Sequence, residues 1–242
     1  MVKFFILLKT MVSMKENLKK YGGIALFVML VIAGIWFVKN YERKIMFHGL
    51  EYKVITSPET GRVWLDRNIG ALQACTSLTD EKCYGDYIQW GRPLDGHEKS
   101  DSFTVSERSN SITPSDGKFI TDEDGGDWSK VDTDGKRRGA FWASVNGEGV
   151  CPEGFRVPTE KELTLENFNS LSDMFLRLKI PLAGYRHYSS ASVYNQGLYG
   201  NLWSSTADTD EARDMYITAG GSGWGTHRRG YGFSLRCVES ED

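Results

Sequence analysis

The stretch CPEGFRVPTEKE, residues 151–162, decides the fold of this chain. Thr159 and Glu162 have the spacing of a capping box, in which each side chain bonds the backbone N–H of the other residue at the start of a helix. Apolar residues then recur every three or four positions up to Pro181, a pattern that predicts one helix or two short ones with an inward apolar stripe. The stripe comprises Leu163, Leu165, Phe168, Leu171, Met174, Phe175 and Leu178.

Short strands are expected on both sides of this helical segment. Residues 50–68 alternate in the manner of two strands, and residues 57–61 (SPETG) carry proline and glycine where a hairpin turn requires them. Near the end, Phe233, Leu235 and Cys237 share one face of a further strand. The chain holds 26 glycines against 6 prolines, which indicates many tight turns. These features predict an α+β domain with short strands and long loops.

The polar segment between Gly91 and Gly149 is expected to be a long elaborated loop region. Five isolated aromatic residues are expected to pin it: Phe103, Phe119, Trp128, Phe141 and Trp142. Its aspartates offer oxygen ligands for calcium, but they miss the EF-hand spacing because Gly135 directly follows Asp134 and no closing glutamate follows. We interpret the run as a solvated acidic loop: Asp122, Asp124, Asp127, Asp132 and Asp134.

Four cysteines, an even number, indicate two disulfides and an oxidising compartment. Three connectivities are open, and we favour Cys75 with Cys83 and Cys151 with Cys237. A metal site is disfavoured because the chain has no C-x-x-C and its histidines lack ligand spacing. Those histidines are His48, His97, His187 and His227.

Residues 22–38 (GGIALFVMLVIAGIWFV) carry no charge and have about the minimum length of a membrane-spanning helix. The excess of lysine before this run predicts that the N-terminus, residues 1–21, is cytoplasmic. Residues 39–49 are then a juxtamembrane stub and residues 50–239 the extracytoplasmic domain. A cleaved signal peptide is the alternative, although no A-x-A pattern follows the run; a buried core helix is another, although no polar period interrupts it.

The charges do not favour nucleic acid or an obvious catalytic centre. Lys and Arg number 29 and Asp and Glu 32, without the basic excess that phosphate backbones attract. Ser204 and Ser205 lack a G-x-S-x-G elbow, which disfavours a catalytic triad. Four acidic residues lie close together in the sequence: Asp208, Asp210, Glu211 and Asp214. We interpret this run as part of a solvated turn and not as the catalytic carboxylate pair of a glycosidase.

The segment between Tyr185 and Tyr231 interleaves tyrosine and tryptophan with serine, asparagine and glycine. Aromatic residues give large contact area at low entropic cost, and small polar residues adapt their hydrogen bonds, so this composition is typical of binding loops. The alternative is that half of these rings are core, as is expected of Trp203.

Six motifs together resemble the Fibrobacter-type major paralogous domain, over about residues 50–239. They are GRVWLDRN at 61–68, YGDYIQWG at 84–91, CPEGFRVPT at 151–159, LAGYR at 182–186, GNLWSST at 200–206 and GFSLRCV at 232–238. The resemblance implies a C-type-lectin-like fold on a bacterial surface.

The closing segment is also similar to the variable proteins of diversity-generating retroelements, which keep a lectin-like scaffold and mutate solvent-facing positions. The similarity implies that Trp203, Phe233 and Cys237 are scaffold. It implies these outward binding-face residues: Tyr188, Ser190, Tyr194, Tyr199, Asn201, Trp224, Thr226, His227 and Arg228.

The sequence departs from two other classes of protein with related folds, an oxidase class and the calcium-dependent lectins. Formylglycine-generating oxidases share the fold but use a reactive cysteine pair, whereas Cys151 and Cys237 have structural positions. Calcium-dependent lectins use E-P-N or Q-P-D and W-N-D motifs, which this chain lacks. We therefore predict non-catalytic recognition of a protein or glycan outside the cytoplasm, with no cofactor and no nucleic acid. A structural or assembly role in the cell envelope is the alternative, and an oxidase relative is the third.

Overall fold

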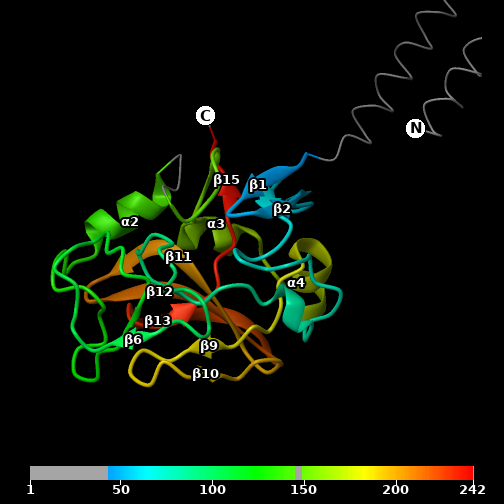
Figure 1. Ribbon diagram of the computed structural model, residues 1–242. Helices are drawn as coiled ribbons and strands as arrows, with labels where there is room; N and C mark the ends of the chain where they lie inside the picture. Colours follow the sequence, from blue (N-terminus) through cyan, green and yellow to red (C-terminus); the bar gives the residue numbers. More distant parts are fainter. Residues whose placement is uncertain (1–42, 145–148, 242) are drawn as a thin grey trace, which may run out of the picture. The chain divides into compact units, whose positions relative to one another are not determined.

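The computed structural model describes residues 43–144 and 149–241, and the part from Lys44 onward forms one unit (Figure 1). The proposed membrane span at residues 22–38 lies outside the described residues. Within the described ranges, no helix combines the length and the apolar content needed to cross a membrane.

The capping box forms as predicted. The Thr159 hydroxyl accepts from the Glu162 N–H at 3.2 Å, and the Glu162 carboxylate accepts from the Thr159 N–H at 2.9 Å. Two short helices follow, α3 (Glu160–Leu165) and α4 (Leu171–Leu178). The Leu163 side chain is buried, but Leu165 is 49% exposed, so its inward placement was wrong.

A buried carboxylate takes the inward position that follows Leu165. Glu166 is fully buried and accepts hydrogen bonds from the hydroxyls of Ser57 and Thr60 and from the indole N–H of Trp64. These bonds tie the end of α3 to the hairpin of residues 54–65. The apolar pattern did not reveal this because an inward glutamate interrupts it.

Most strands and the helices are short, as the composition predicts, but three strands near the end of the domain, at residues 200–208, 211–218 and 221–228, are eight or nine residues long. Among the described residues, the remaining helical elements are α2 (Lys136–Ala143) and the 3-10 turn η1 (Glu81–Cys83). The strands are β1 (Ile45–Phe47), β2 (Leu50–Tyr52), β3 (Val54–Thr56), β4 (Val63–Leu65), β5 (Ile88–Gln89), β6 (Thr104–Val105), β7 (Phe119–Ile120), β8 (Phe155–Arg156), β9 (Tyr185–Arg186), β10 (Val193–Tyr194), β11 (Gly200–Asp208), β12 (Glu211–Thr218), β13 (Gly221–Arg228), β14 (Gly232–Phe233) and β15 (Val238–Glu239).

These strands form mostly antiparallel sheets with the orders β10-β9-β14-β5, β3-β4-β15-β8 and β11-β12-β13, beside the pairs β1-β2 and β6-β7. Among the strand pairings of the described residues, only β6 with β7 is parallel. The predicted hairpin is β3-β4, where the Gly61 N–H donates to the Ser57 carbonyl at 3.0 Å. Pairing of β15 with β4 brings the end of the domain onto its beginning (Figure 1). The domain is therefore α+β, as predicted.

The ordered domain begins earlier than residue 50. Strand β1 lies within the segment predicted as a juxtamembrane stub, and it pairs with β2 from Ile45 opposite Tyr52 to Phe47 opposite Leu50. Ile45 and Phe47 also pack against the main core cluster. This pairing makes residues 45–47 part of the fold.

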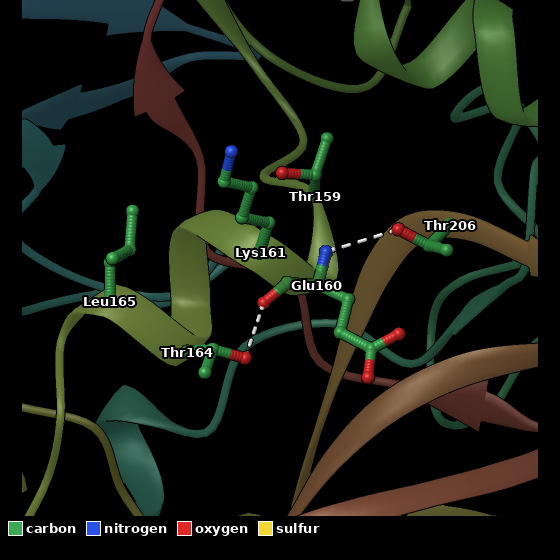
Figure 2. A pocket seen from close by; sticks show the side chains of 6 residues that line it. All are labelled: Thr159, Glu160, Lys161, Thr164, Leu165 and Thr206. Atoms are coloured by element: carbon green, nitrogen blue, oxygen red, sulfur yellow. Dashed lines mark hydrogen bonds between the residues drawn. The ribbon is translucent and has the colours of Figure 1, made fainter.

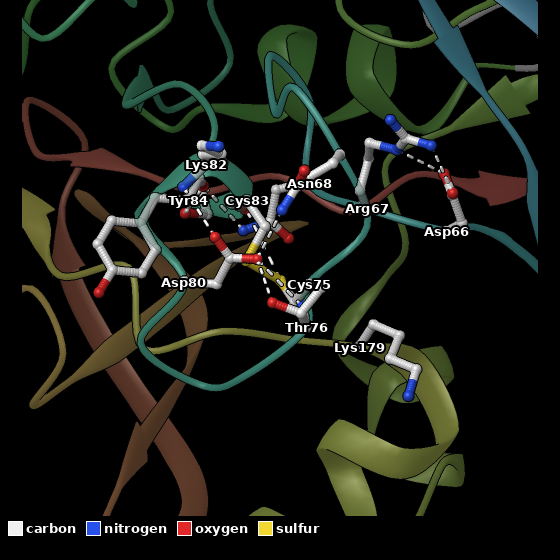
Figure 3. Close-up of a disulfide and its surroundings, with 12 residues drawn as sticks. Asp66, Arg67, Asn68, Cys75, Thr76, Asp80, Lys82, Cys83, Tyr84 and Lys179 are labelled. Carbon is white, nitrogen blue, oxygen red and sulfur yellow. Dashed lines mark hydrogen bonds and ion pairs between the residues drawn. A yellow bond between two sulfur atoms is a disulfide. The ribbon is translucent and has the colours of Figure 1, made fainter.

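Both predicted disulfides are present. Cys75 and Cys83 close a short loop around Asp80, whose carboxylate accepts from Thr76 and from the Lys82 N–H (Figure 3). Cys151 and Cys237 join positions 86 residues apart. In the chain-entropy model a loop of that length contributes roughly 4 to 5 kcal/mol.

The loop region is pinned by buried rings, with one exception. Phe119, Trp128 and Trp142 are fully buried, whereas Phe103 is 85% exposed and does not pin the loop. The acidic loop also differs from its prediction as solvated, because Asp127 is only 8% exposed.

Asp127 is the centre of a buried ion network. Its carboxylate accepts two bonds of 2.8 Å from the Arg138 guanidinium and one of 3.3 Å from Arg229. Both arginines are fully buried, and each lies over the Trp90 ring. A carboxylate that sequence alone places in solvent thus holds two loops and the end of β13 together.

Candidate functional site

The β11-β12-β13 sheet has two different faces because side chains alternate along each strand. Leu202, Met215 and Ile217 belong to one core cluster, and Trp224 packs against it. Asp214 and Tyr216 point to the other face. Pairing places Asn201 opposite Tyr216, and Asp214 opposite Gly225.

A pocket of about 440 Å³ opens on this second face. Its lining comes from four segments of the chain and is dominated by tyrosine. The lining residues are Tyr185, Asn195, Tyr199, Asn201, Tyr216, His227, Tyr231 and Phe233. We call this cavity the tyrosine pocket.

Two glycines of β13 leave room for the side chains of this face. A Cβ at Gly223 would stand 2.4 Å from the Tyr216 hydroxyl, and one at Gly225 would stand 3.2 Å from the His227 ring. Contacts below 3.0 Å are essentially never observed for a Cβ atom, so a side chain at Gly223 would displace the Tyr216 ring. The alternation of glycine along β13 therefore shapes the pocket.

Asp214 lies beneath the tyrosine pocket and is fully buried. One carboxylate oxygen is 2.6 Å from His227 Nδ1, and the other accepts from Asn201 Nδ2 at 2.8 Å. Both partners line the pocket. The buried charge is thus satisfied by two side chains that also face the cavity.

This arrangement favours the protonated form of His227. Burial opposes protonation, but the hydrogen bond to Asp214 and the negative charges of Asp214 and Glu211 outweigh it and raise the pKa of His227. The side chain of His227 is 37% exposed. An imidazolium so held presents Nε2–H as a hydrogen-bond donor.

Packed rings support the pocket from behind. Tyr231 contacts the rings of Tyr185, His227 and Phe233 at centroid distances of 5.3 to 5.7 Å. Phe233 in turn stacks on the buried Trp203 at 4.2 Å. Edge-to-face and stacked contacts of this kind fix ring positions before any ligand arrives.

Three of the nine predicted binding residues line the tyrosine pocket: Tyr199, Asn201 and His227. Asn201 differs from its prediction as an outward residue, because it is 7% exposed and its amide is engaged by Asp214. Trp224 lies on the opposite face of the sheet, where the Arg213 guanidinium lies over its ring.

The other predicted residues lie outside the pocket lining. The Arg228 guanidinium donates to the Tyr188 hydroxyl at 2.7 Å, and the Tyr188 ring contacts Tyr231. Tyr194 is 45% exposed beside Tyr185, and Ser190 and Thr226 are exposed.

Sequence reasoning missed Asp214, which it placed in a solvated turn. The turn between β11 and β12 is at residues 209 and 210, so Asp214 lies within β12. A signal was present: Asp214 and Tyr216 alternate with Met215 and Ile217, which is the pattern of a strand with one polar face.

Two other parts of the domain bring polar side chains together. Among the described residues, Asp95, His97 and Glu98 are close enough to hold a metal. However, His97 Nδ1 lies 2.7 Å from Asp95, and its Nε2 accepts the Gln89 N–H. Both ring nitrogens are therefore engaged within the protein, and burial lowers the pKa of His97 to about 4.

A second recess lies beside α3, with Thr206 of β11 on its other side (Figure 2). Its polar groups already bond one another: the Glu160 N–H donates to Thr206, and the Glu160 carboxylate pairs with Arg213. The Thr164 hydroxyl donates to the Glu160 carbonyl. This recess therefore offers few free partners, and the tyrosine pocket is the stronger candidate.

Comparison with known proteins gave no match, since no family model, no curated protein and no solved structure is significantly similar to this chain.

Proposed function

We propose that this chain is a non-catalytic recognition protein that binds its ligand in the tyrosine pocket. The observation that carries the proposal is the lining: four tyrosines, two asparagines, a histidine and a phenylalanine line a cavity of about 440 Å³. Binding sites are concave and combine apolar contact area with a few placed polar groups. This cavity combines tyrosine rings with the polar groups of His227 and Asn201. Tyr199 and Tyr216, 44% and 39% exposed, supply contact area for the ligand.

The scaffold that carries the pocket is, in our proposal, a C-type-lectin-like domain related to the Fibrobacter-type major paralogous domain. Short antiparallel strands and the Cys151–Cys237 disulfide support it. Retroelement diversification of the binding face is part of the same proposal. Sequencing the DNA around the gene tests it, because a template repeat and a reverse transcriptase must lie nearby.

The proposed location is the outer side of a membrane, with residues 22–38 as the anchor and the N-terminus in the cytoplasm. Two disulfides support an oxidising compartment. Protease treatment of intact and opened cells tests the topology. The proposal requires cleavage of the domain without access to the cytoplasm.

The four cysteines are all joined in disulfides, which supports recognition over an oxidase. A thiol-labelling assay on the native protein tests this point. The proposal requires no labelling before denaturation and reduction, whereas a reactive cysteine pair would label at once.

The decisive experiment compares two equally exposed tyrosines on the full chain. Tyr199 lines the pocket and Tyr194 does not, although their exposed fractions are 44% and 45%. Each variant to alanine is tested against arrays of glycans and of extracellular proteins. The proposal requires binding to fall at least about tenfold for Tyr199→Ala and to persist for Tyr194→Ala. Equal binding by both variants would exclude the pocket as the recognition site.

A further inference from the structure

Asp214 determines which hydrogen-bonding atoms face the tyrosine pocket. It engages the amide nitrogen of Asn201 and Nδ1 of His227. The remaining side-chain atoms are the amide oxygen Oδ1 of Asn201 (called here its carbonyl oxygen) and Nε2 of His227, and neither has a partner among the described residues. Both residues line the pocket, so the pair presents one acceptor and, on the imidazolium, one donor.

An acceptor beside a donor discriminates among ligand groups by charge. A carboxylate has no proton to give the Asn201 oxygen, and the attraction of the imidazolium for it is offset by the repulsion from Asp214. An ammonium satisfies the Asn201 oxygen, but it is repelled by the imidazolium as it is attracted by Asp214, so this pair of opposite charges gives neither ion a net counter-charge. A hydroxyl accepts from His227 and donates to Asn201, because it carries one proton and two lone pairs.

The walls add further hydroxyl groups and ring faces. Tyr185, Tyr199, Tyr216 and Tyr231 line the cavity, and none of their hydroxyls has a partner among the described residues. Their rings offer apolar area, and their hydroxyls both donate and accept. The ligand that matches this lining is a compact ring with several hydroxyls and little charge.

We infer that the tyrosine pocket binds a neutral sugar ring, with one ring hydroxyl held between His227 Nε2 and the Asn201 carbonyl oxygen. The inference rests on the proposed function and names its ligand class. It assigns Asp214 a positioning role, since this carboxylate orients both partners without lining the pocket itself.

The same geometry predicts the effect of pH on binding. The ionisable groups around His227 are Asp214 and Glu211 of β12 and Tyr231, with Arg228 adjacent and bonded to Tyr188. Burial raises the pKa of Tyr231, so its hydroxyl stays neutral. When His227 loses its proton, Nε2 becomes a second acceptor, and one hydroxyl proton cannot serve both. Affinity therefore falls as pH rises through the pKa of His227.

The test uses the full chain, solubilised in a detergent without a sugar headgroup, on an array of neutral oligosaccharides and their uronic-acid-terminated counterparts. We expect binding to neutral members that weakens at least about fivefold between about pH 6 and about pH 9. His227→Gln is expected to reduce that binding about tenfold and to remove its pH dependence. His187→Gln is the matched control, because His187 is also a half-buried histidine but does not line the pocket.

Four outcomes would overturn the inference: preference for uronic-acid-terminated glycans, affinity that rises with pH, equal loss for His227→Gln and His187→Gln, or absence of glycan binding. If an array protein still binds in a way that Tyr199→Ala abolishes, the proposed function survives while the sugar assignment fails. If nothing bound depends on Tyr199, both fail.

Discussion

Two buried carboxylates, Asp127 and Asp214, show how the same chemical group serves the fold in one region and a surface pocket in another. Asp127 meets two fully buried arginines whose guanidinium groups lie over tryptophan rings. Asp214 meets His227 and Asn201, each of which keeps a hydrogen-bonding atom for the tyrosine pocket. A buried charge whose partners are themselves buried fixes loops. One whose partners line a cavity positions them for a ligand.

The largest loss of stability is expected when the buried ion network around Asp127 is broken. Asp127→Ala removes the counter-charge that Arg138 and Arg229 share and leaves Arg138 its ion pair with Asp132; removing one partner of a buried pair costs about 3 to 5 kcal/mol. Urea denaturation of the full chain, followed by tryptophan fluorescence, measures the loss. Asp134→Ala is the control, because Asp134 pairs with Lys136 on the surface and its loss should leave the curve unchanged. If the denaturation curve of Asp127→Ala matches that of the wild type, Asp127 does not stabilise the fold, and the proposed difference between the two regions is wrong.

A smaller loss of stability is expected when Asp214 loses its hydrogen bonds to His227 and Asn201. Asp214→Ala removes two hydrogen bonds, but His227 is partly exposed and can bond water instead, so we expect about 1 to 3 kcal/mol. The same variant should lose ligand binding completely, unlike Asp127→Ala at a temperature where that variant stays folded. Asp210→Ala, in the exposed turn, should change neither property.

The pH dependence of stability sharpens the comparison further. The folded pKa of His227 is raised above its ordinary value of 6.5, so its contribution is fully present below that value and is lost as pH rises through the folded pKa. Denaturation midpoints measured on both sides of that range should fall with pH, and His227→Gln should remove this slope. His187→Gln should keep it, because burial lowers the pKa of His187 and gives a dependence of opposite sign.

The smallest effect is expected for the exposed tyrosines. Tyr199→Ala and Tyr194→Ala should each change the unfolding free energy by no more than about 0.5 kcal/mol, because both rings are nearly half exposed. Differential scanning calorimetry checks this. A large drop for Tyr199→Ala would make it a packing residue, and its binding defect would then carry no information about the ligand.

Local patterns predicted the parts of the fold that depend on neighbours in sequence. The capping box at Thr159, the hairpin turn at Ser57–Gly61 and the two short helices follow from spacings of two to four residues. The inward placement of Leu165 was wrong because a local apolar pattern does not show that Glu166 has buried partners 102 to 109 residues away. Phe103 failed because a lone aromatic in a loop carries no such period.

The candidate site was predicted only in part. Composition identified the right segment, and three of the residues named from the resemblance line the pocket. The segment could not reveal which face each side chain takes, so Trp224 and His227 were grouped although they lie on opposite faces of β13.

By itself the sequence determined the α+β class and the helix start, because capping and turn geometry depend on residue type and spacing. It left three cysteine pairings open, and the fold brings together the pairs that we favoured. Tertiary structure decided the surroundings of each charged side chain. Whether an aspartate lies in solvent, between arginines or beneath a pocket depends on which distant strands pack around it, and the free energy of a charge depends on those surroundings. The sequence does not show that Asp127 lies between arginines and Asp214 beneath the tyrosine pocket; the fold determines this difference.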